Sequence, residues 1–208
     1  MRRIPPPMLA GRLPFASFAA VMAIAATVSG CTLKPPGEGR KADEDGIREA
    51  RVVKADEAVR EGVGIELEGL DYTVFLTRQL NPQDPEDRGY YQGPPPPTGS
   101  ALYGVFIEVC NKEEATAVSA DRFKVTDTQE SEFEPLEPEP DNVFAYQPSR
   151  LPPEQCIPNE LSLAAEGPTA AAIMIFQLPI SATENRPIEL EIEPPSGRGP
   201  LAKIELDI

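Results

Sequence analysis

Apolar and polar residues alternate along much of the chain from residue 63 onward, and a period of two is typical of β-strands. The clearest alternation lies near the end, where residues 188–192 and 204–208 place Ile and Leu between Glu, Lys and Asp. A third alternating segment, with Phe75 as its exception, has apolar side chains at Leu70, Tyr72, Val74, Leu76 and Leu80. Each pattern predicts a strand with one face toward a core.

Shorter segments add to this set of strands. Alternation or short apolar runs predict strands at residues 103–109, 123–126, 132–134, 143–146, 161–163 and 170–178. The last of these reads AAAIMIFQL, which is apolar on both faces and indicates the most buried strand. Because no strong helical pattern separates the strands, the sequence predicts an all-β, antiparallel sandwich of about 7–9 strands over residues 63–208.

A long irregular segment follows the first of these strands. Residues 81–99 read NPQDPEDRGYYQGPPPPTG, which is too rich in Pro and Gly for regular structure and predicts an exposed loop. Its adjacent Tyr90 and Tyr91, with a run of prolines shortly after them, are typical of a recognition surface because such groups present preformed contacts. The interpretation that we favour is a loop that packs its own aromatic rings over the end of the sandwich, with a recognition surface as the alternative.

The start of the chain has a different character. Three arginines and no acidic residue occur in the first 12 residues, an Ala-rich apolar stretch follows, and it ends in Val28, Ser29, Gly30 and Cys31. This pattern resembles a bacterial lipoprotein signal. The resemblance implies cleavage before Cys31 and a diacylglycerol on its thiol, which makes the membrane a partner. The alternative is a transmembrane helix over residues 13–33, which is just long enough to span a bilayer.

Residues between this signal and the predicted sandwich have little apolar character. Residues 32–46 read TLKPPGEGRKADEDG and predict a flexible spacer. Residues 47–61 have apolar positions at helical spacing, which favours a short helix. The expected organisation is therefore a signal peptide at 1–30, a lipidated N-terminus and spacer at 31–62, and the sandwich at 63–208.

The number of cysteines relates to the redox state of the cellular compartment in which the protein folds. An odd number is unusual in an exported protein, but lipid on Cys31 leaves Cys110 and Cys156 as an even pair. In an oxidising compartment these two are expected to form a disulfide. The alternative is two separately buried thiols.

The charge and composition of the chain argue against several classes of ligand and reaction. The chain carries 34 acidic against 19 basic residues, a net charge of −15, which argues against nucleic acid as a partner. No histidine is present to serve as the base of a serine or cysteine nucleophile, or as a metal ligand. The densest acidic run comprises Glu130, Glu132, Glu134, Glu137, Glu139 and Asp141. It is interpreted as a solvated loop, with a weak calcium site as the alternative.

The order of the strands resembles a known family. Residues 107–111 match a strand of the form hydrophobic, valine, asparagine, residues 123–133 match a hairpin, and residues 176–179 match a late strand ending in proline. Together they resemble the immunoglobulin-like domain of unknown function found in bacterial lipoproteins and secreted antigens, the immunoprotective extracellular group. The hairpin departs from the pattern at Gln129 and Glu130, where a glycine is usual. The resemblance implies an immunoglobulin-like sandwich and no functional residues.

These observations favour a non-catalytic binding or structural module, held on the extracytoplasmic side of the cell membrane by its lipid. An envelope protein or a glycan is the expected partner. No catalytic residue, cofactor or metal site is predicted. Two alternatives remain: a calcium-binding module that uses the acidic run, and an envelope enzyme that uses paired carboxylates.

Overall fold

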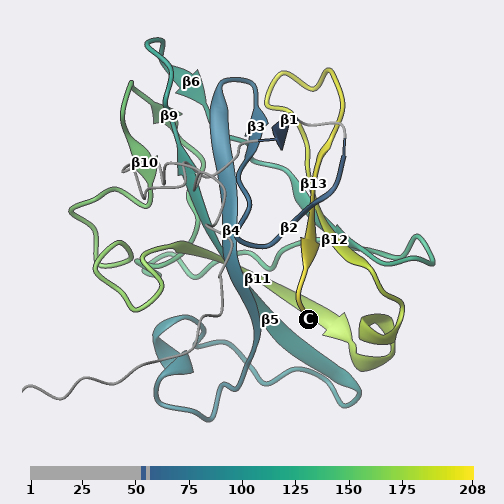
Figure 1. Cartoon of the computed structure of the whole chain (residues 1–208). Coiled ribbons are helices and arrows are strands. Elements are labelled where there is room, and N and C mark those ends of the chain that lie inside the picture. Colours follow the sequence, from purple (N-terminus) through teal and green to yellow (C-terminus); the bar gives the residue numbers. More distant parts are fainter. Residues whose placement is uncertain (1–52, 55–56) are drawn as a thin grey trace, which may run out of the picture. The chain divides into compact units, whose positions relative to one another are not determined.

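Two β-sheets pack face to face in the computed structural model, which describes residues 53–54 and 57–208 (Figure 1). The first sheet has the order β1-β3-β4-β5-β10, and β11 pairs with another stretch of β5. All its pairs are antiparallel except β1 with β3. Its strands are β1 (Val53–Lys54), β3 (Ile65–Leu67), β4 (Leu70–Leu80), β5 (Ser100–Cys110), β10 (Cys156–Ile157) and β11 (Ala172–Pro179).

The second sheet has the order β2-β13-β12-β7-β8. It is antiparallel except for the β2–β13 pair. Its strands are β2 (Val59–Arg60), β7 (Phe123–Thr126), β8 (Glu132–Phe133), β12 (Ile188–Ile192) and β13 (Ala202–Leu206). A small third sheet joins β6 (Ala117–Val118) to β9 (Arg150–Leu151), and two 3-10 helices, η1 (Asp87–Gly89) and η2 (Ile180–Glu184), complete the described elements. The predicted β-sandwich is confirmed.

The main core lies between the two sheets. Alternate residues of each strand point inward, and those with almost no exposed surface include Tyr72, Ile107, Phe176, Leu190 and Ile204. The prediction that residues 170–178 form a strand buried on both faces is confirmed by β11, most of whose residues are buried. Burial of these apolar side chains is the main stabilising contribution to the fold.

A β-bulge at Phe75 changes which face of β4 points inward. The pairing of β4 with β5 shifts between Val74 and Leu76, which leaves Phe75 exposed. Before the bulge, Tyr72 and Val74 point into the main core; after it, Leu76 and Leu80 join a second apolar cluster on the outer face of the first sheet. The expectation that all five apolar residues of this strand share one face is therefore wrong, because one extra residue reverses the alternation.

The segment ahead of residue 63 also departs from expectation. Of residues 47–61, the structure describes 53–54 and 57–61, and these contain strands β1 and β2 in place of the expected helix. Val59 is buried in the core and lies opposite Ile204 in β13. Burial of this side chain and pairing with a sheet edge outweigh a weak helical preference. The sheets therefore include residues that were assigned to the spacer.

Two predicted short strands are not present as such. Residues 161–163 form turns, and Leu161 is 93% exposed. Residues 143–146 contribute only a single bridge, from Ala145 to Ile173. No helix among the described residues has the length and apolar character that crossing a membrane requires. The predicted signal peptide, Cys31 and most of the predicted spacer lie outside the described residues.

Thr77 supplies a test of this core. Its hydroxyl oxygen is buried and has no hydrogen-bond partner among the described residues. Thr77→Val keeps the branched shape and removes the unpaired hydroxyl, so we expect the free energy of unfolding to rise by about 1 kcal/mol. Urea unfolding measures the change, with Thr73→Val at a half-buried position of the same strand as control. A loss of stability in Thr77→Val alone would contradict the placement of this side chain.

Candidate functional site

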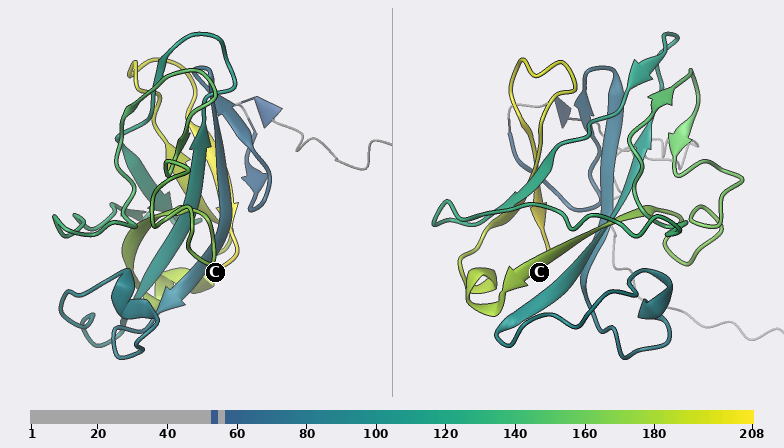
Figure 2. Two further views of the ribbon diagram at one scale, coloured as in Figure 1. Left: turned by 90° about the vertical axis from the view of Figure 1, so that its left-hand side faces the viewer. Right: turned by 180° about the vertical axis from the view of Figure 1, so that it is seen from behind.

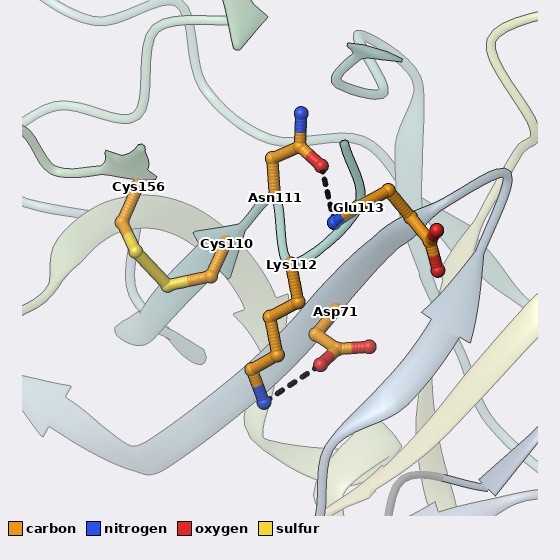
Figure 3. Close-up of a disulfide and its surroundings, with 6 residues drawn as sticks. All are labelled: Asp71, Cys110, Asn111, Lys112, Glu113 and Cys156. Atoms are coloured by element: carbon orange, nitrogen blue, oxygen red, sulfur yellow. Dashed lines mark hydrogen bonds and ion pairs between the residues drawn. A yellow bond between two sulfur atoms is a disulfide. The ribbon is translucent and has the colours of Figure 1, made fainter. Parts of the chain in front are cut away.

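The predicted disulfide between Cys110 and Cys156 is confirmed. Cys110 is the last residue of β5, Cys156 is the first residue of β10, and the two lie directly opposite each other in the antiparallel pair. Figure 3 shows the bond together with the turn that follows β5. The disulfide fixes the short strand β10 to the centre of the first sheet.

Asn111, the next residue, is a buried polar group whose hydrogen bonds are satisfied. Its side-chain Nδ2 donates to the carbonyl oxygens of Leu151 and Ala115, each at 2.8 Å. Its Oδ1 accepts a hydrogen bond from the Glu113 N–H at 2.9 Å (Figure 3). The sequence pattern identified this asparagine as part of a motif, and the structure shows that it joins the turn after β5 to β9.

Possible metal ligands gather at one place in the part of the chain that the structure describes. Glu108, Cys110 and Cys156 have ligand atoms within 4.8 Å of one another, but both sulfurs are already bonded in the disulfide. The acidic run at residues 130–141 contains no such group among the described residues. Within that run, Glu132 binds Lys124 and the Glu139 carboxylate accepts a hydrogen bond from Gln92 N–H. The calcium alternative therefore gains no support from the geometry.

Tyr90 and Tyr91 lie on the outer face of the first sheet. The Tyr90 ring makes edge contacts with Phe106 and Phe144, with ring centres 5.2 and 5.1 Å apart. Both tyrosines are half-buried against the second apolar cluster, and the Tyr91 hydroxyl donates to the Pro94 carbonyl. The β4–β5 connection that carries them extends beyond the end of these strands (Figures 1 and 2). The favoured interpretation, in which the loop packs its own rings on the sandwich, thus describes Tyr90.

Asp87 anchors this loop. Its carboxylate is almost fully buried, accepts a hydrogen bond from Arg78 at 2.5 Å and another from the Asn81 N–H at 2.7 Å. Desolvation by burial acts to raise the pKa of Asp87, but the hydrogen bonds and the positive charge of Arg78 outweigh it and lower the pKa below its ordinary value. The same guanidinium lies 5.7 Å from the centre of the Tyr90 ring, a cation–π distance. Asp87 therefore holds Arg78, and Arg78 supports Tyr90.

Removing this anchor is expected to loosen the loop. Asp87→Ala leaves the Asn81 N–H and the Arg78 guanidinium without their acceptor, and we expect the free energy of unfolding to fall by about 2 kcal/mol. Hydrogen exchange should become faster over residues 81–91. Glu86→Ala, at an exposed position of the same loop whose carboxylate binds none of the described residues, is the matched control. Equal behaviour of the two variants would show that Asp87 has no special role.

A cavity opens beside the tyrosines. It has a volume of about 230 Å³. It lies between the loop that carries Tyr90 and Tyr91, the acidic segment of residues 134–142 and strand β11. Its apolar lining includes Leu136, Tyr146, Ile173 and Ile175. The aromatic loop and the acidic loop, which the sequence patterns did not connect, therefore meet at one site. We refer to it as the edge cavity.

Tyr146 is held rigidly in the wall of this cavity. Its hydroxyl donates to the Ala120 carbonyl at 2.8 Å, and the Ala120 N–H donates to the Tyr72 hydroxyl at 2.8 Å. Burial is the main cause that raises the pKa of Tyr72, to about 12, and burial also raises the pKa of Tyr146. Both hydroxyls are therefore protonated and structural near neutral pH.

The outer edge of β11 forms the back of the edge cavity. Ile173 bonds to residues beyond this edge through both of its peptide groups: its N–H donates to Phe144 O at 2.8 Å and its carbonyl accepts from Tyr146 N at 2.9 Å. The Ile175 carbonyl accepts from Leu136 N at 2.7 Å. In an antiparallel ladder the two peptide groups of one residue point the same way, so the Ile175 N–H also points outward. It has no acceptor among the described residues outside the ladder.

The rim of the edge cavity is negatively charged. Asp121, Glu137 and Glu139 line it, and no lysine or arginine of the described residues does. Desolvation by burial is the larger cause that raises the pKa of Tyr91, and the negative charge of Glu139 raises it further. The combination of a carboxylate rim, aromatic walls and an apolar back suits a ligand with a positive group on an apolar stem.

Sequence reasoning identified the tyrosines and the acidic run, but missed the edge cavity between them. The irregular composition of residues 134–142 signals a loop, and nothing in it signals that the loop follows β11. The bridge from Pro135 to Phe176 and the bridge from Ala145 to Ile173 create that arrangement. Such contacts join positions about 30–40 residues apart and leave no local pattern.

No protein-family model matches the chain, and no curated protein sequence matches it. Among solved structures, it is similar to the yjhA protein from Bacillus subtilis, at 9% identity and a TM-score of 0.44, over 72% of this chain and 99% of that one. It is similar also to an uncharacterized beta-sandwich protein from Clostridium difficile 630, at 14% identity and a TM-score of 0.44, over 74% of this chain and 97% of that one.

Proposed function

We propose that this protein is a non-catalytic binding module of the bacterial cell envelope, tethered to the extracytoplasmic face of the membrane by lipid on Cys31. The resemblance to the immunoglobulin-like domains of bacterial lipoproteins and secreted antigens is part of this proposal. One observation carries the binding role: the aromatic and acidic loops converge on the edge cavity, and the Ile175 N–H at its back has no acceptor among the described residues. The disulfide supports an oxidising compartment.

The state of the buried carboxylates supports a role without catalysis. A general acid needs a carboxyl with a raised pKa at a reactive position. Glu191 is buried, yet Lys124 and Lys203 lie 3.2 and 2.7 Å away, and their hydrogen bonds outweigh desolvation and lower its pKa. Among the described carboxyls with a resolved shift, only Glu108 has a raised pKa, mainly through burial, and it lies beside the disulfide. These groups fit structural roles.

Hydrogen exchange tests the binding site. The full chain, purified in a mild detergent, is compared in buffer and in the presence of solubilised cell-envelope material. We expect slower exchange over residues 90–93 and 134–148, which border the edge cavity, and unchanged exchange over the β12–β13 pair, which does not line it. Protection spread evenly over the molecule, or none at all, would contradict a binding site at this cavity.

Fractionation tests the tether separately. The unaltered protein should carry a fatty-acid label and remain with membranes, whereas Cys31→Ala should lose the label. Recovery of a labelled Cys31→Ala protein would refute lipidation at this residue. Retention on membranes without label would favour the transmembrane-helix alternative.

A further inference from the structure

We infer that the edge cavity receives an extended peptide segment, with a lysine or arginine side chain that lies in the cavity with its charge near the rim carboxylates, and a backbone carbonyl bonded to the Ile175 N–H. This inference rests on the proposed binding function and names its ligand class. The relevant features are the charge of the rim, the shape and chemistry of the walls, and the outward Ile175 N–H at the edge of β11.

The rim carboxylates lack strong cationic partners among the described residues. Glu137 and Glu139 form no ion pair there, and Asp121 has only the exposed Arg122, with its oxygen 3.9 Å from Nε. The two carboxylate oxygens of Glu139 share the Gln92 N–H, at 3.3 and 3.4 Å. Three negative charges around one opening repel one another and attract a cation, and they do so more strongly where water is partly excluded.

The walls suit the stem of a long basic side chain. Lysine and arginine bury their methylene groups against apolar surface and keep the charged end near water. The edge cavity offers Leu136, Ile173 and Ile175 to such a stem and the two tyrosine rings to its charge. Its volume of about 230 Å³ exceeds by far what a single water molecule needs.

The outward Ile175 N–H distinguishes a peptide from a small amine. It is the one donor left at this part of the β11 edge by the described residues, because the peptide groups of Ile173 and the Ile175 carbonyl are already hydrogen-bonded. A sheet edge binds an extended peptide through its backbone, and side-chain pockets supply the specificity. The chain moves away from the β11 edge after Leu136 and contacts it again at Phe144. The outward Ile175 N–H lies between these two contacts. A carbonyl of an added segment would satisfy this donor, while the adjacent side chain of that segment would reach the carboxylates.

Nuclear magnetic resonance titration of the full chain in detergent tests the inference. The probes are an acetylated and amidated hexapeptide with a central lysine among valine and serine residues, the same peptide with norleucine in place of lysine, and free n-butylamine. We expect the lysine peptide to shift the Ile175 amide and Tyr91 signals and to bind at least about tenfold more tightly than the norleucine peptide. Glu137→Gln/Glu139→Gln should remove this preference. Glu160→Gln/Glu184→Gln, which neutralises two exposed carboxylates elsewhere, should keep it.

The other outcomes overturn the inference in different ways. Equal binding of lysine and norleucine peptides would reject the cationic ligand and leave a binding site for apolar segments. Binding of n-butylamine as tight as that of the peptide, without a shift of the Ile175 amide, would reject addition at the β11 edge. An absence of shifts with every probe would reject the ligand class altogether. Protection of the edge cavity by envelope material would still support the proposed function in each case.

Discussion

Changing Cys110 and Cys156 together to alanine is expected to lower the free energy of unfolding by about 4 kcal/mol. The two cysteines are 46 residues apart, so their bond closes a long loop in the unfolded chain. Opening that loop raises the entropy of the unfolded state, which favours unfolding. The folded state loses little packing because both residues are only partly buried. Urea unfolding at neutral pH measures the difference.

Reduction provides the matched control for this prediction. Dithiothreitol should destabilise the unaltered protein by a similar amount and leave the double variant unchanged. A double variant as stable as the unaltered protein would show that the bond does not constrain the chain. Alkylation of both thiols in the native protein, without reductant, would show that the bond does not form.

Asn111→Asp is expected to destabilise the fold by about 3–5 kcal/mol at neutral pH, the cost of an uncompensated buried charge. The change is nearly isosteric, but it replaces the Nδ2 group that donates to the carbonyl oxygens of Leu151 and Ala115. A carboxylate would face two carbonyl oxygens at a position that is only 1% exposed. Its desolvation and its repulsion from these oxygens both favour the unfolded state.

The pH dependence separates this cause from a general loss of packing. In the variant, the folded-state pKa of the introduced carboxyl would be raised above its unfolded value of about 3.9 because the charged form is disfavoured. The penalty should therefore be full at neutral pH and should shrink as the pH falls through that raised value. Asn159→Asp, at an exposed turn, is the control and should cost little. A penalty for Asn111→Asp that is the same at low and neutral pH would contradict the electrostatic cause.

The strands were largely predictable because side-chain alternation is a local property of the sequence. Residues 204–208 have one buried and one more exposed side, whereas in residues 188–192 Glu191 on the polar side is also buried; β12 and β13 overlap these two segments. The reversal in β4 was not predictable, since a bulge depends on how β5 lies opposite it. Phe75, the one residue that broke the apolar and polar pattern, marks its position.

Short segments were less predictable, because tertiary contacts decide their structure. The spacing of Val52 and Val59 favoured a helix, but burial of Val59 against the core places it in β2. Leu161 and Leu163 alternate with Ser162 as a strand would, yet both leucines are exposed in a turn. In both places the local preference is weak, and the available partner in the fold determines the outcome.

The candidate site was predictable only in its parts. Tyr90, Tyr91 and the acidic run stand out in the sequence by residue type. Their convergence depends on two contacts at the edge of β11, one near each end of residues 135–145. The hydrogen bond from Asn142 Nδ2 to the Tyr90 carbonyl, at 2.8 Å, then joins the two loops across the edge cavity. None of these contacts has a signature within a short window of sequence.

Photocrosslinking in living cells tests most directly whether this protein is an envelope binding module that uses the edge cavity. A photoreactive amino acid is placed at Gln147, an exposed residue that lines the cavity, or at Gln155, an exposed residue that does not. The predicted result is one discrete crosslinked species from position 147, absent at position 155 and reduced when unlabelled protein is produced in excess. No crosslink at position 147, or the same crosslinks from both positions, would contradict the proposed binding site.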